Sequence, residues 1–314
     1  MTNGQVQLWC PAKNSWFSYS QQNWICGCGG NDNSITVSIL TAVKDREREF
    51  ERAIESISKQ SYLTTLENFN RIEHVVQDGG GSTSRKIVIE KFAKCHTTLS
   101  LLEDSSLYDG FNQAFKLSRG NLIAYLNSDD FYAIDFIKKS IAILELSNAD
   151  WSFGNIIMDY GFQSVFHPGR PDYFVSPWSN FLGFHHTTIV CKREIFASIG
   201  TFKTELSGEP LDLASDYLWF LSAMKEGFCG VYSPSIIGYM KFGGVSTVNI
   251  KQSFIEGCRV AIDTYPEKKR AIRLIWSSRF VIGLYFDTAR HKFPRKIAQA
   301  ARVIYRQWYS RQKS

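Results

Sequence analysis

The stretch LLEDSSLYDGFNQAFKLSRGNLIAYLNSDDFY, residues 101–132, decides the fold expected for this chain. Its last third holds a short apolar segment of strand type, residues 121–126, which breaks abruptly into Asn127-Ser128-Asp129-Asp130. Two adjacent carboxylates at the end of a buried strand are costly, because like charges are desolvated together. A divalent cation that also binds a phosphate would relieve that cost. The alternative is a solvated acidic turn, and this stretch alone does not separate the two.

Strands and helices alternate around this stretch. The sequence predicts strands at 35–40, 71–76, 97–102 and 121–126, and helices at 45–60, 84–95 and 108–117. This order predicts an α/β fold with a mostly parallel sheet flanked by helices. Ligands bind such sheets at the carboxyl ends of the strands. Asp78 and the pair Asp129-Asp130 follow two different strands, and together they favour a metal or nucleotide site over an acidic turn.

A glycine run follows Asp78, in the segment Gly79-Gly80-Gly81-Ser82. It has neither the lysine and spacing of a P-loop nor the spacing of a dinucleotide fingerprint. It therefore predicts a flexible turn at which a ligand can approach the backbone.

Length and cysteine content bound the class of protein. The chain has 314 residues, 44% of them hydrophobic, which is enough for a sizeable core. Seven cysteines without a signal-peptide pattern predict a reducing, cytoplasmic location. No apolar run is long enough to span a bilayer. Cys10, Cys26 and Cys28 lie in a stretch, residues 1–33, that is expected to be irregular, and they lack the paired spacing of a zinc site.

The net charge of +6 is unevenly distributed. Residues 271–314 contain ten Lys or Arg and a single acid, Asp287, so they carry +9 and leave −3 for the rest of the chain. A basic tail on an acidic body is not the pattern of a general nucleic-acid binder, and we expect no nucleic-acid partner.

The tail contains an expected amphipathic helix that begins at Pro294. Ile297, Ala301, Ile304 and Trp308 form one apolar stripe, and Arg295, Arg302 and Arg306 lie on the opposite face. This pattern is typical of a helix in an anionic membrane interface, with residues 275–286 adding a further apolar surface. An ordinary helix packed on the domain is the alternative. The first interpretation predicts peripheral attachment at the inner face of the membrane.

Eight short segments, in this order, resemble the GT-A glycosyltransferases of family 2. They are residues 41–46 (TAVKDR), 53–62 (AIESISKQSY), 77–83 (QDGGGST), 107–112 (LYDGFN), 126–132 (LNSDDFY), 193–200 (REIFASIG), 214–217 (ASDY) and 242–246 (FGGVS). Each segment alone is weakly specific, but eight of them in the right order are specific to the family. The resemblance implies a GT-A domain at 34–248, preceded by the irregular extension 1–33 and followed by a helical, basic region at 249–314.

The resemblance implies an inverting transfer of a sugar from a nucleotide-diphosphate donor, expected to be UDP-linked, to a glycan or lipid-linked acceptor in surface polysaccharide synthesis. Mg²⁺ or Mn²⁺ would neutralise the leaving diphosphate. It implies that Asp129 is the metal ligand and that Asp130 assists at the metal or the sugar. The residues expected at the donor are Thr41, Val43, Asp78, Asp109, Asn112, Ser128, Asp130 and His185.

The acceptor hydroxyl needs a general base, and the resemblance makes Asp216 the candidate. From spacing alone, Ser215 or Asp216 would instead be a helix N-cap before an apolar run. Asp109 and His185 have structural alternatives as well. Asp109 would then only interact favourably with the helix dipole, and His185 would pack in the fold or lie at its surface.

The chain departs from the family pattern at several points. The loop after Asp78 has an added glycine and ends in Ser84, and the segment 104–112 lacks a Lys and a Gly. Residues 63–70 look like an insertion. Asn127 stands where the metal motif would have its first acid. Nucleotide or sugar preference could therefore differ from that of common members. The competing functions are a sugar nucleotidyltransferase, which would need a glycine- and arginine-rich loop near the first strand, and a non-catalytic nucleotide-sugar binder or scaffold.

Overall fold

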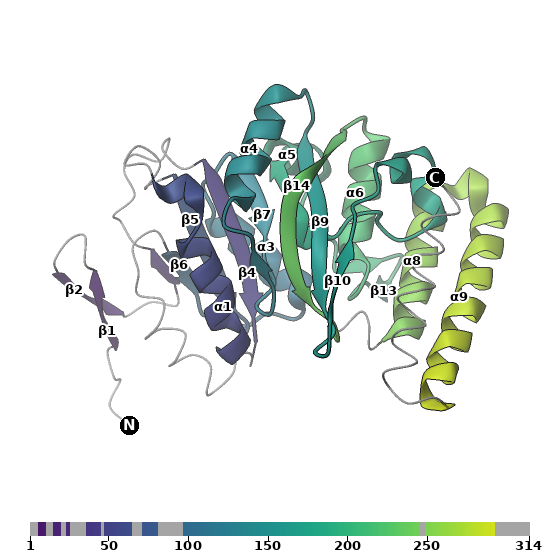
Figure 1. Ribbon diagram of the computed structural model, residues 1–314, viewed down its shortest axis with the longest axis horizontal. Coiled ribbons are helices and arrows are strands. Elements are labelled where there is room, and N and C mark those ends of the chain that lie inside the picture. The colour runs from purple at the N-terminus through teal and green to yellow at the C-terminus, as the bar shows by residue number, and fades with distance from the viewer. Residues whose placement is uncertain are drawn as a thin grey trace.

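The computed structural model describes residues 6–10, 15–19, 23–25, 36–44, 47–64, 71–80, 97–244 and 249–292, and the fold is reported for these ranges. A ten-stranded sheet runs through them (Figure 1). Its strands are, in spatial order, β3 (Asn23–Ile25), β6 (Thr97–Ser100), β5 (Ile72–Asp78), β4 (Val37–Val43), β7 (Leu122–Tyr125), β11 (Val190–Lys192), β9 (Trp151–Asp159), β14 (Gly230–Lys241) and β8 (Phe131–Tyr132), with β10 (Ser164–His167) paired to β9. Two hairpins are separate from it, β1 (Val6–Cys10) with β2 (Ser15–Tyr19) and β12 (Glu205–Leu206) with β13 (Glu209–Pro210).

Helices cover both faces of the sheet, as expected for an α/β fold (Figure 1). Helices α1 (Glu47–Ser58) and α4 (Phe136–Leu146) share one hydrophobic cluster with Val37 and Ile39 of β4. Helices α3 (Leu107–Leu117), α5 (Glu194–Ile199) and α6 (Ser215–Lys225) share the other with Leu40 and Ala42. β4 thus supplies both cores, because successive side chains of a strand point to opposite faces.

The parallel half of the sheet brings four carboxyl ends to one edge. β6, β5, β4 and β7 pair in parallel, with Val43 opposite Asp78 and Leu40 opposite Tyr125. β11 is antiparallel to both β7 and β9, so β9 and its parallel partner β14 point the same way as β7. The residues that follow these strands therefore converge on one end of the molecule.

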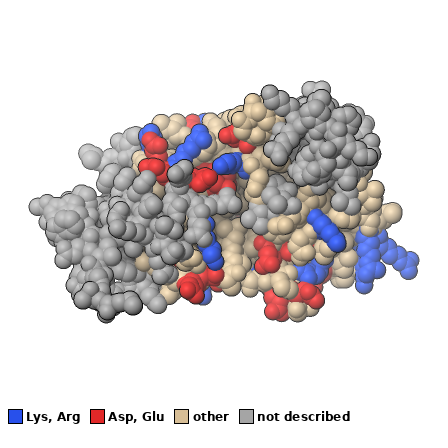
Figure 2. Space-filling view, turned by 90° about the horizontal axis from the view of Figure 1, so that it is seen from below, with Lys and Arg blue, Asp and Glu red and all other residues tan. Residues whose placement is uncertain are grey.

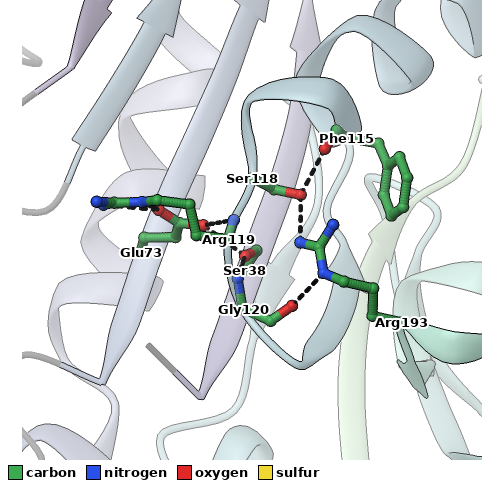
Figure 3. Close-up of polar contacts among 7 residues, drawn as sticks. All are labelled: Ser38, Glu73, Phe115, Ser118, Arg119, Gly120 and Arg193. Carbon is green, nitrogen blue, oxygen red and sulfur yellow. Dashed lines mark hydrogen bonds and ion pairs between the residues drawn. The ribbon is translucent and has the colours of Figure 1, made fainter. Parts of the chain in front are cut away.

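A buried carboxylate organises the opposite edge (Figure 3). Glu73 of β5 is fully buried and accepts hydrogen bonds from its cross-strand neighbour Ser38 at 2.6 Å and from the Arg119 backbone and guanidinium. Ser38 Oγ in turn accepts from Gly120 N at 2.7 Å. Arg193, just before α5, donates to Gly120 O at 2.6 Å and to Ser118 Oγ at 2.7 Å. The turn into β7 is thereby tied to β4, β5 and α5.

The C-terminal part of the described chain packs onto the domain as a helix pair. It consists of α8 (Ile250–Thr264), a 3₁₀ turn η6 (Pro266–Lys268) and α9 (Lys269–Lys292). Trp276 of α9 is 2% exposed and stacks edge-on with Phe181, and a methyl group at Gly257 of α8 would lie 2.5 Å from its ring. Leu274 and Val281, on the outer side of α9, stay exposed. None of the described helices combines the length and apolar character needed to cross a bilayer.

Glu256 joins this helix pair to α6. It is fully buried, and its Oε2 accepts hydrogen bonds from Leu213 N at 2.7 Å and Ala214 N at 3.1 Å, immediately before α6 begins. Its Oε1 accepts from Gln252 at 3.0 Å. A carboxylate from α8 thus satisfies two backbone donors of the segment that leads into α6.

The α/β architecture expected from the sequence is confirmed, and the limits of the described strands and helices differ from the expected ones by at most three residues. Part of the stretch at 1–33 is not irregular, however, because it contributes β1, β2 and β3. β3 pairs with β6 through main-chain hydrogen bonds, which a sequence pattern of mixed polar residues does not reveal. The helix expected at 84–95, the helix that begins at Pro294, and residues 45–46, 81–83 and 245–246 lie outside the described residues.

A first prediction concerns His74, which is buried with Nε2 3.0 Å from Thr41 Oγ1. Burial lowers the pKa of His74 from 6.5 to about 3. Between these values the unfolded chain binds a proton that the folded chain does not, so the free energy of unfolding falls as pH falls, by up to about 1.4 kcal/mol per pH unit. In urea titrations between about pH 7.5 and pH 5, His74→Gln should flatten this dependence. Equal slopes in both proteins would contradict the assignment.

A second prediction concerns Glu256. Glu256→Ala leaves the backbone donors of Leu213 and Ala214 buried without an acceptor, which should lower the free energy of unfolding by about 2–4 kcal/mol. Glu256→Gln keeps an acceptor oxygen and should lose less. Urea unfolding of both variants, with Lys251→Ala on the exposed side of the same helix as a control, tests this. Equal stabilities of the Ala and Gln variants would show that these hydrogen bonds are not the source of the effect.

Candidate active site

The carboxyl ends of the strands carry the polar side chains that the sequence singled out. Asp78 ends β5, and Asp129 and Asp130 follow β7. Figure 2 looks at this end of the molecule, which is the end at which β9 turns into β10 in Figure 1. Acidic and basic side chains lie close together on this face (Figure 2). The sheet topology therefore gathers charges from separate parts of the chain at one edge.

Asp130 is held from three directions. Its Oδ2 accepts from Asn127 Nδ2 at 3.0 Å and from Thr187 Oγ1 at 2.8 Å, and its Oδ1 accepts from Lys241 N at 3.3 Å. The side chain is 2% exposed. Burial, together with the charge of neighbouring Asp129, raises the pKa of Asp130 to about 7. The carboxyl is thus pre-positioned, and its ionisation depends on nearby charge.

A row of polar side chains runs from Asp130 to Asp216. Asn127 Nδ2, which bonds Asp130, also lies 2.9 Å from His186 Nε2. His186 Nδ1 then lies 3.6 Å from Asp216 Oδ2. Burial lowers the pKa of His186, and the charges of Asp216 and Asp129 oppose that shift. The predicted metal-side and base-side carboxylates therefore belong to one connected site.

Asp216 stands in the first turn of α6. Its Oδ1 accepts hydrogen bonds from Tyr108 Oη of α3 and from Tyr217 N, at 2.9 and 2.8 Å. The residue in the N-cap position is Ala214, which has no side-chain cap, and Ser215 Oγ donates to Lys203 O. Neither Ser215 nor Asp216 is the N-cap, because α6 already begins at Ser215. The backbone N–H groups of Leu213 and Ala214, just before the helix, are bound by Glu256 instead.

A second acidic group lies near Asp78. Asp78 is fully buried and its Oδ1 accepts from Gly80 N at 3.2 Å. The carboxyl of Asp104 lies against Gly79, so closely that a methyl group at Gly79 would overlap it. Burial raises the pKa of Asp104 to about 6, with Lys44 opposing the shift and Asp109 and Asp78 adding to it. The close approach of Asp104 therefore requires glycine at position 79.

The other predicted residues divide into two groups. Ser128 and His185 are close to the row, since Ser128 lies between Asn127 and Asp129 and His185 precedes the 3₁₀ turn η5 (His186–Thr188). Asp109, in the first turn of α3, lies beside Asp104 and accepts a hydrogen bond from Ser105 N at 2.9 Å. Thr41 and Val43 are buried in β4, and Thr41 bonds His74. The Asn112 amide exchanges two hydrogen bonds with the Phe202 backbone, 2.7 and 3.0 Å long. The structure thus gives Thr41 and Asn112 inward-facing partners.

The residues present fit a divalent cation bound partly by a substrate. Among the described side chains, no group of three His, Cys, Asp or Glu could hold a metal ion by itself. Asp129 and Asp130 nevertheless offer hard carboxylate oxygens. Burial and, after it, the charge of Asp129 raise the pKa of Asp130, and a bound cation would offset that like-charge repulsion. One or two carboxylates plus phosphate oxygens form a usual Mg²⁺ site.

Sequence reasoning missed Asn127, His186, Thr187, Tyr108 and Asp104 as site residues. His186 adjoins the expected His185, but which of two adjacent histidines faces the site depends on the turn η5. In the sequence, Asn127 is recognisable only as a departure from an acidic motif. Tyr108 and Asp104 lie inside the recognised segment but join the site through contacts across the fold.

Comparisons with known proteins agree with this architecture. A sequence profile described as "Glycosyl transferase family 2" matches residues 38–204, more than half of the chain. No curated protein matches the chain. Residues 1–349 of Staphylococcus aureus TarS superpose with a TM-score of 0.55 at 15% identity, covering 82% of this chain and 73% of that one. The same fragment in complex with UDP-GlcNAc gives a TM-score of 0.55 at 14% identity, covering 78% and 71%.

A mannosyltransferase from Pyrobaculum calidifontis, in complex with GDP-Man and Mn²⁺, superposes with a TM-score of 0.52 at 14% identity, covering 86% of this chain and 84% of that one. At these identities the superpositions establish a shared fold. Together with the profile match, which carries the family assignment, they confirm the GT-A architecture: the chain belongs to glycosyltransferase family 2 and is a transferase enzyme.

Proposed function

We propose that the enzyme is an inverting, metal-dependent glycosyltransferase that moves a sugar from a UDP-linked donor to a hydroxyl of a glycan or lipid-linked acceptor in surface polysaccharide synthesis. The observation that carries the proposal is the connected row from Asp130 to Asp216 at the carboxyl edge of the sheet. It supplies a metal-side carboxylate and a separate base within one site. The solved complexes of similar fold contain UDP-GlcNAc in one case and GDP-Man with Mn²⁺ in the other, which supports a nucleotide-sugar donor.

The donor half of the site would be formed around Asp78 and Asp129. Asp78 would accept a hydrogen bond from the nucleoside, beside the Gly79 backbone that a ligand can approach closely. Asp129 would hold Mg²⁺ or Mn²⁺, with Asp130 assisting at the ion or the sugar. The ion, when bound, would supply neutralisation of the diphosphate charge. Thr41, Val43, Asp109, Asn112, Ser128 and His185 complete the proposed donor-binding set.

The acceptor half would use Asp216 as the general base. The acceptor hydroxyl gives its proton to Asp216 Oδ2 as its oxygen bonds to the anomeric carbon, and the bond from that carbon to the diphosphate breaks on the opposite face. Configuration is inverted, and the nucleoside diphosphate leaves. Tyr108 Oη and Tyr217 N both bond Oδ1, which leaves Oδ2 toward His186 and the reacting hydroxyl.

A third prediction tests the reaction. With a panel of nucleotide sugars, Mn²⁺ and a hydroxyl acceptor, the enzyme should release a nucleoside diphosphate, measured by a coupled assay or chromatography. Asp216→Asn should lower kcat by roughly 10²–10⁴ with donor affinity nearly unchanged, because only proton acceptance is lost. Asp129→Ala should lower both turnover and the dependence of donor binding on Mn²⁺.

The same assay identifies the competing functions. Release of pyrophosphate in place of a nucleoside diphosphate would indicate a nucleotidyltransferase. Donor binding without turnover, unaffected by Asp216→Asn, would indicate a nucleotide-sugar binder. Either result would overturn the proposed transfer.

We also propose that the basic region at 249–314 holds the enzyme at the inner face of an anionic membrane, where a lipid-linked acceptor would be available. The described part of α9 supports this, since Leu274 and Val281 are exposed on the same helix as Lys269, Arg270 and Arg273. Trp276 is not part of this surface, because it is buried against Phe181.

A fourth prediction tests membrane binding by flotation. The full chain should float with vesicles that contain anionic phospholipid and much less with purely zwitterionic vesicles, since exposed cations gain about 1 kcal/mol each near an anionic surface. Removal of residues 288–314 should reduce recovery. Equal recovery of the two proteins, or of the two kinds of vesicle, would contradict the proposal.

A further inference from the structure

Asn127 is the junction between the two halves of the site. Its amide nitrogen lies 3.0 Å from Asp130 Oδ2 and 2.9 Å from His186 Nε2. An amide NH₂ group has two N–H donors, so one nitrogen can serve both acceptors. Asp130 Oδ2 also accepts a hydrogen bond from Thr187 Oγ1, so an acceptor stands at this position and the amide presents its nitrogen to it. The hydrogen-bond network therefore assigns the nitrogen to this position.

This contact determines where the imidazole of His186 carries its proton. A ring nitrogen that accepts a hydrogen bond has no hydrogen, so Nε2 is the bare nitrogen of the neutral ring and Nδ1 carries the N–H. Nδ1 is also the atom that lies 3.6 Å from Asp216 Oδ2. That separation is longer than a formed hydrogen bond, and catalytic pairs often shorten only when substrate binds. The N–H of His186 thus points toward the oxygen that would take the acceptor proton.

The turn that carries His186 is itself fixed to the donor half. In η5, Thr188 N and Thr188 Oγ1 both donate to His185 O at 2.8 Å, and Thr187 Oγ1 donates to Asp130 at 2.8 Å. His186 and Asp130 are therefore both attached to the turn η5.

We propose that Asn127 and His186 are positioning residues for the general base: the Asn127 amide selects the Nδ1–H form of His186, and this N–H orients Asp216 Oδ2 toward the acceptor hydroxyl. The inference rests on the proposed function of Asp216. It also accounts for the amide at position 127. An aspartate there would offer only acceptors to Nε2 and would favour a proton on that nitrogen, so the neutral ring with its single proton on Nδ1 would no longer be selected.

A fifth prediction separates this role from simple packing by means of matched substitutions. In His186→Asn the side-chain amide can still present an N–H near the position of Nδ1, whereas in His186→Gln the amide reaches the position of Nε2 and leaves Asp216 without that donor. We expect kcat to fall by roughly 10²-fold in His186→Gln and in Asn127→Asp, and by less than about tenfold in His186→Asn. The affinity for the nucleotide sugar, measured by calorimetry, should stay within about threefold in the His186 variants.

A double-substitution cycle and a spectroscopic signature give independent readings. Asn127→Asp should add little to the loss in kcat when His186 is already Asn, because no ring tautomer is left to select. In ¹⁵N NMR of the full chain without ligands, the His186 ring, identified by its absence in His186→Gln, should show a protonated Nδ1 and a bare Nε2. Asn127→Asp should change that pattern.

The outcomes distinguish this inference from the proposed function. If the unmodified enzyme transfers no sugar from any donor, the proposed function fails, and the NMR measurement still reports the tautomer. If the enzyme is active but His186→Gln is as fast as His186→Asn, or if Nε2 carries the proton, the positioning role is wrong while the transferase function stands.

Discussion

The buried carboxylate of Glu73 is the constraint on which the arrangement of the sheet depends. A charge without access to water must be compensated on the spot, and here the compensating donors come from Ser38 on the adjacent strand and from Arg119 in the turn before β7. Removing one partner of such a buried group typically costs about 3–5 kcal/mol. The three strands are thus aligned near their amino ends. Because they run parallel, their carboxyl ends all lie at the opposite edge, where Asp78 ends β5 and Asp129 follows β7.

The carboxyl edge, which holds the proposed active site, also contains buried carboxylates, but there their charge is not fully compensated. At the amino edge the Glu73 carboxylate is paired with the Arg119 guanidinium, whereas at the carboxyl edge the hydrogen-bond partners of Asp130 orient it without neutralising it. Asp130 receives three hydrogen bonds and yet its pKa is raised to about 7 by burial and by Asp129. The hydrogen bonds hold such a site in place, but its carboxylate charge is not compensated. This suits a substrate that binds together with a cation and whose leaving group carries negative charge.

The C-terminal helix pair is part of this scaffold. Glu256 of α8 accepts hydrogen bonds from two backbone N–H groups just before α6 and so supports the first turn of this helix, which carries Asp216. The profile of the family ends at residue 204, before either of them. The proposed base and its support therefore lie beyond the residues that the family profile matches.

Much of the parallel half of the fold could be predicted from local pattern. The apolar runs that became β4, β5 and β7 and the stripe Phe50, Ala53 and Ile57 of α1 are governed by short-range periodicity, and the position of Asp78 and Asp129 at strand ends follows from them. Strand β3 and the inward partners of Thr41 and Asn112 could not be predicted, because main-chain pairing and side-chain contacts between distant segments leave no periodic signal.

The amino-acid sequence by itself determined the α/β class, the family, and the carboxylates available at the ends of the strands, since each depends on the order of residues along a few turns of chain. Only the tertiary structure decided which side chains connect those carboxylates. Asn127, His186, Tyr108 and Asp216 are separated by up to 108 positions and meet because the antiparallel β11 brings η5 back beside β7 and Glu256 fixes the start of α6. Hydrogen bonds act over about 3 Å, so their partners are set by the folded path of the chain and not by spacing in the sequence.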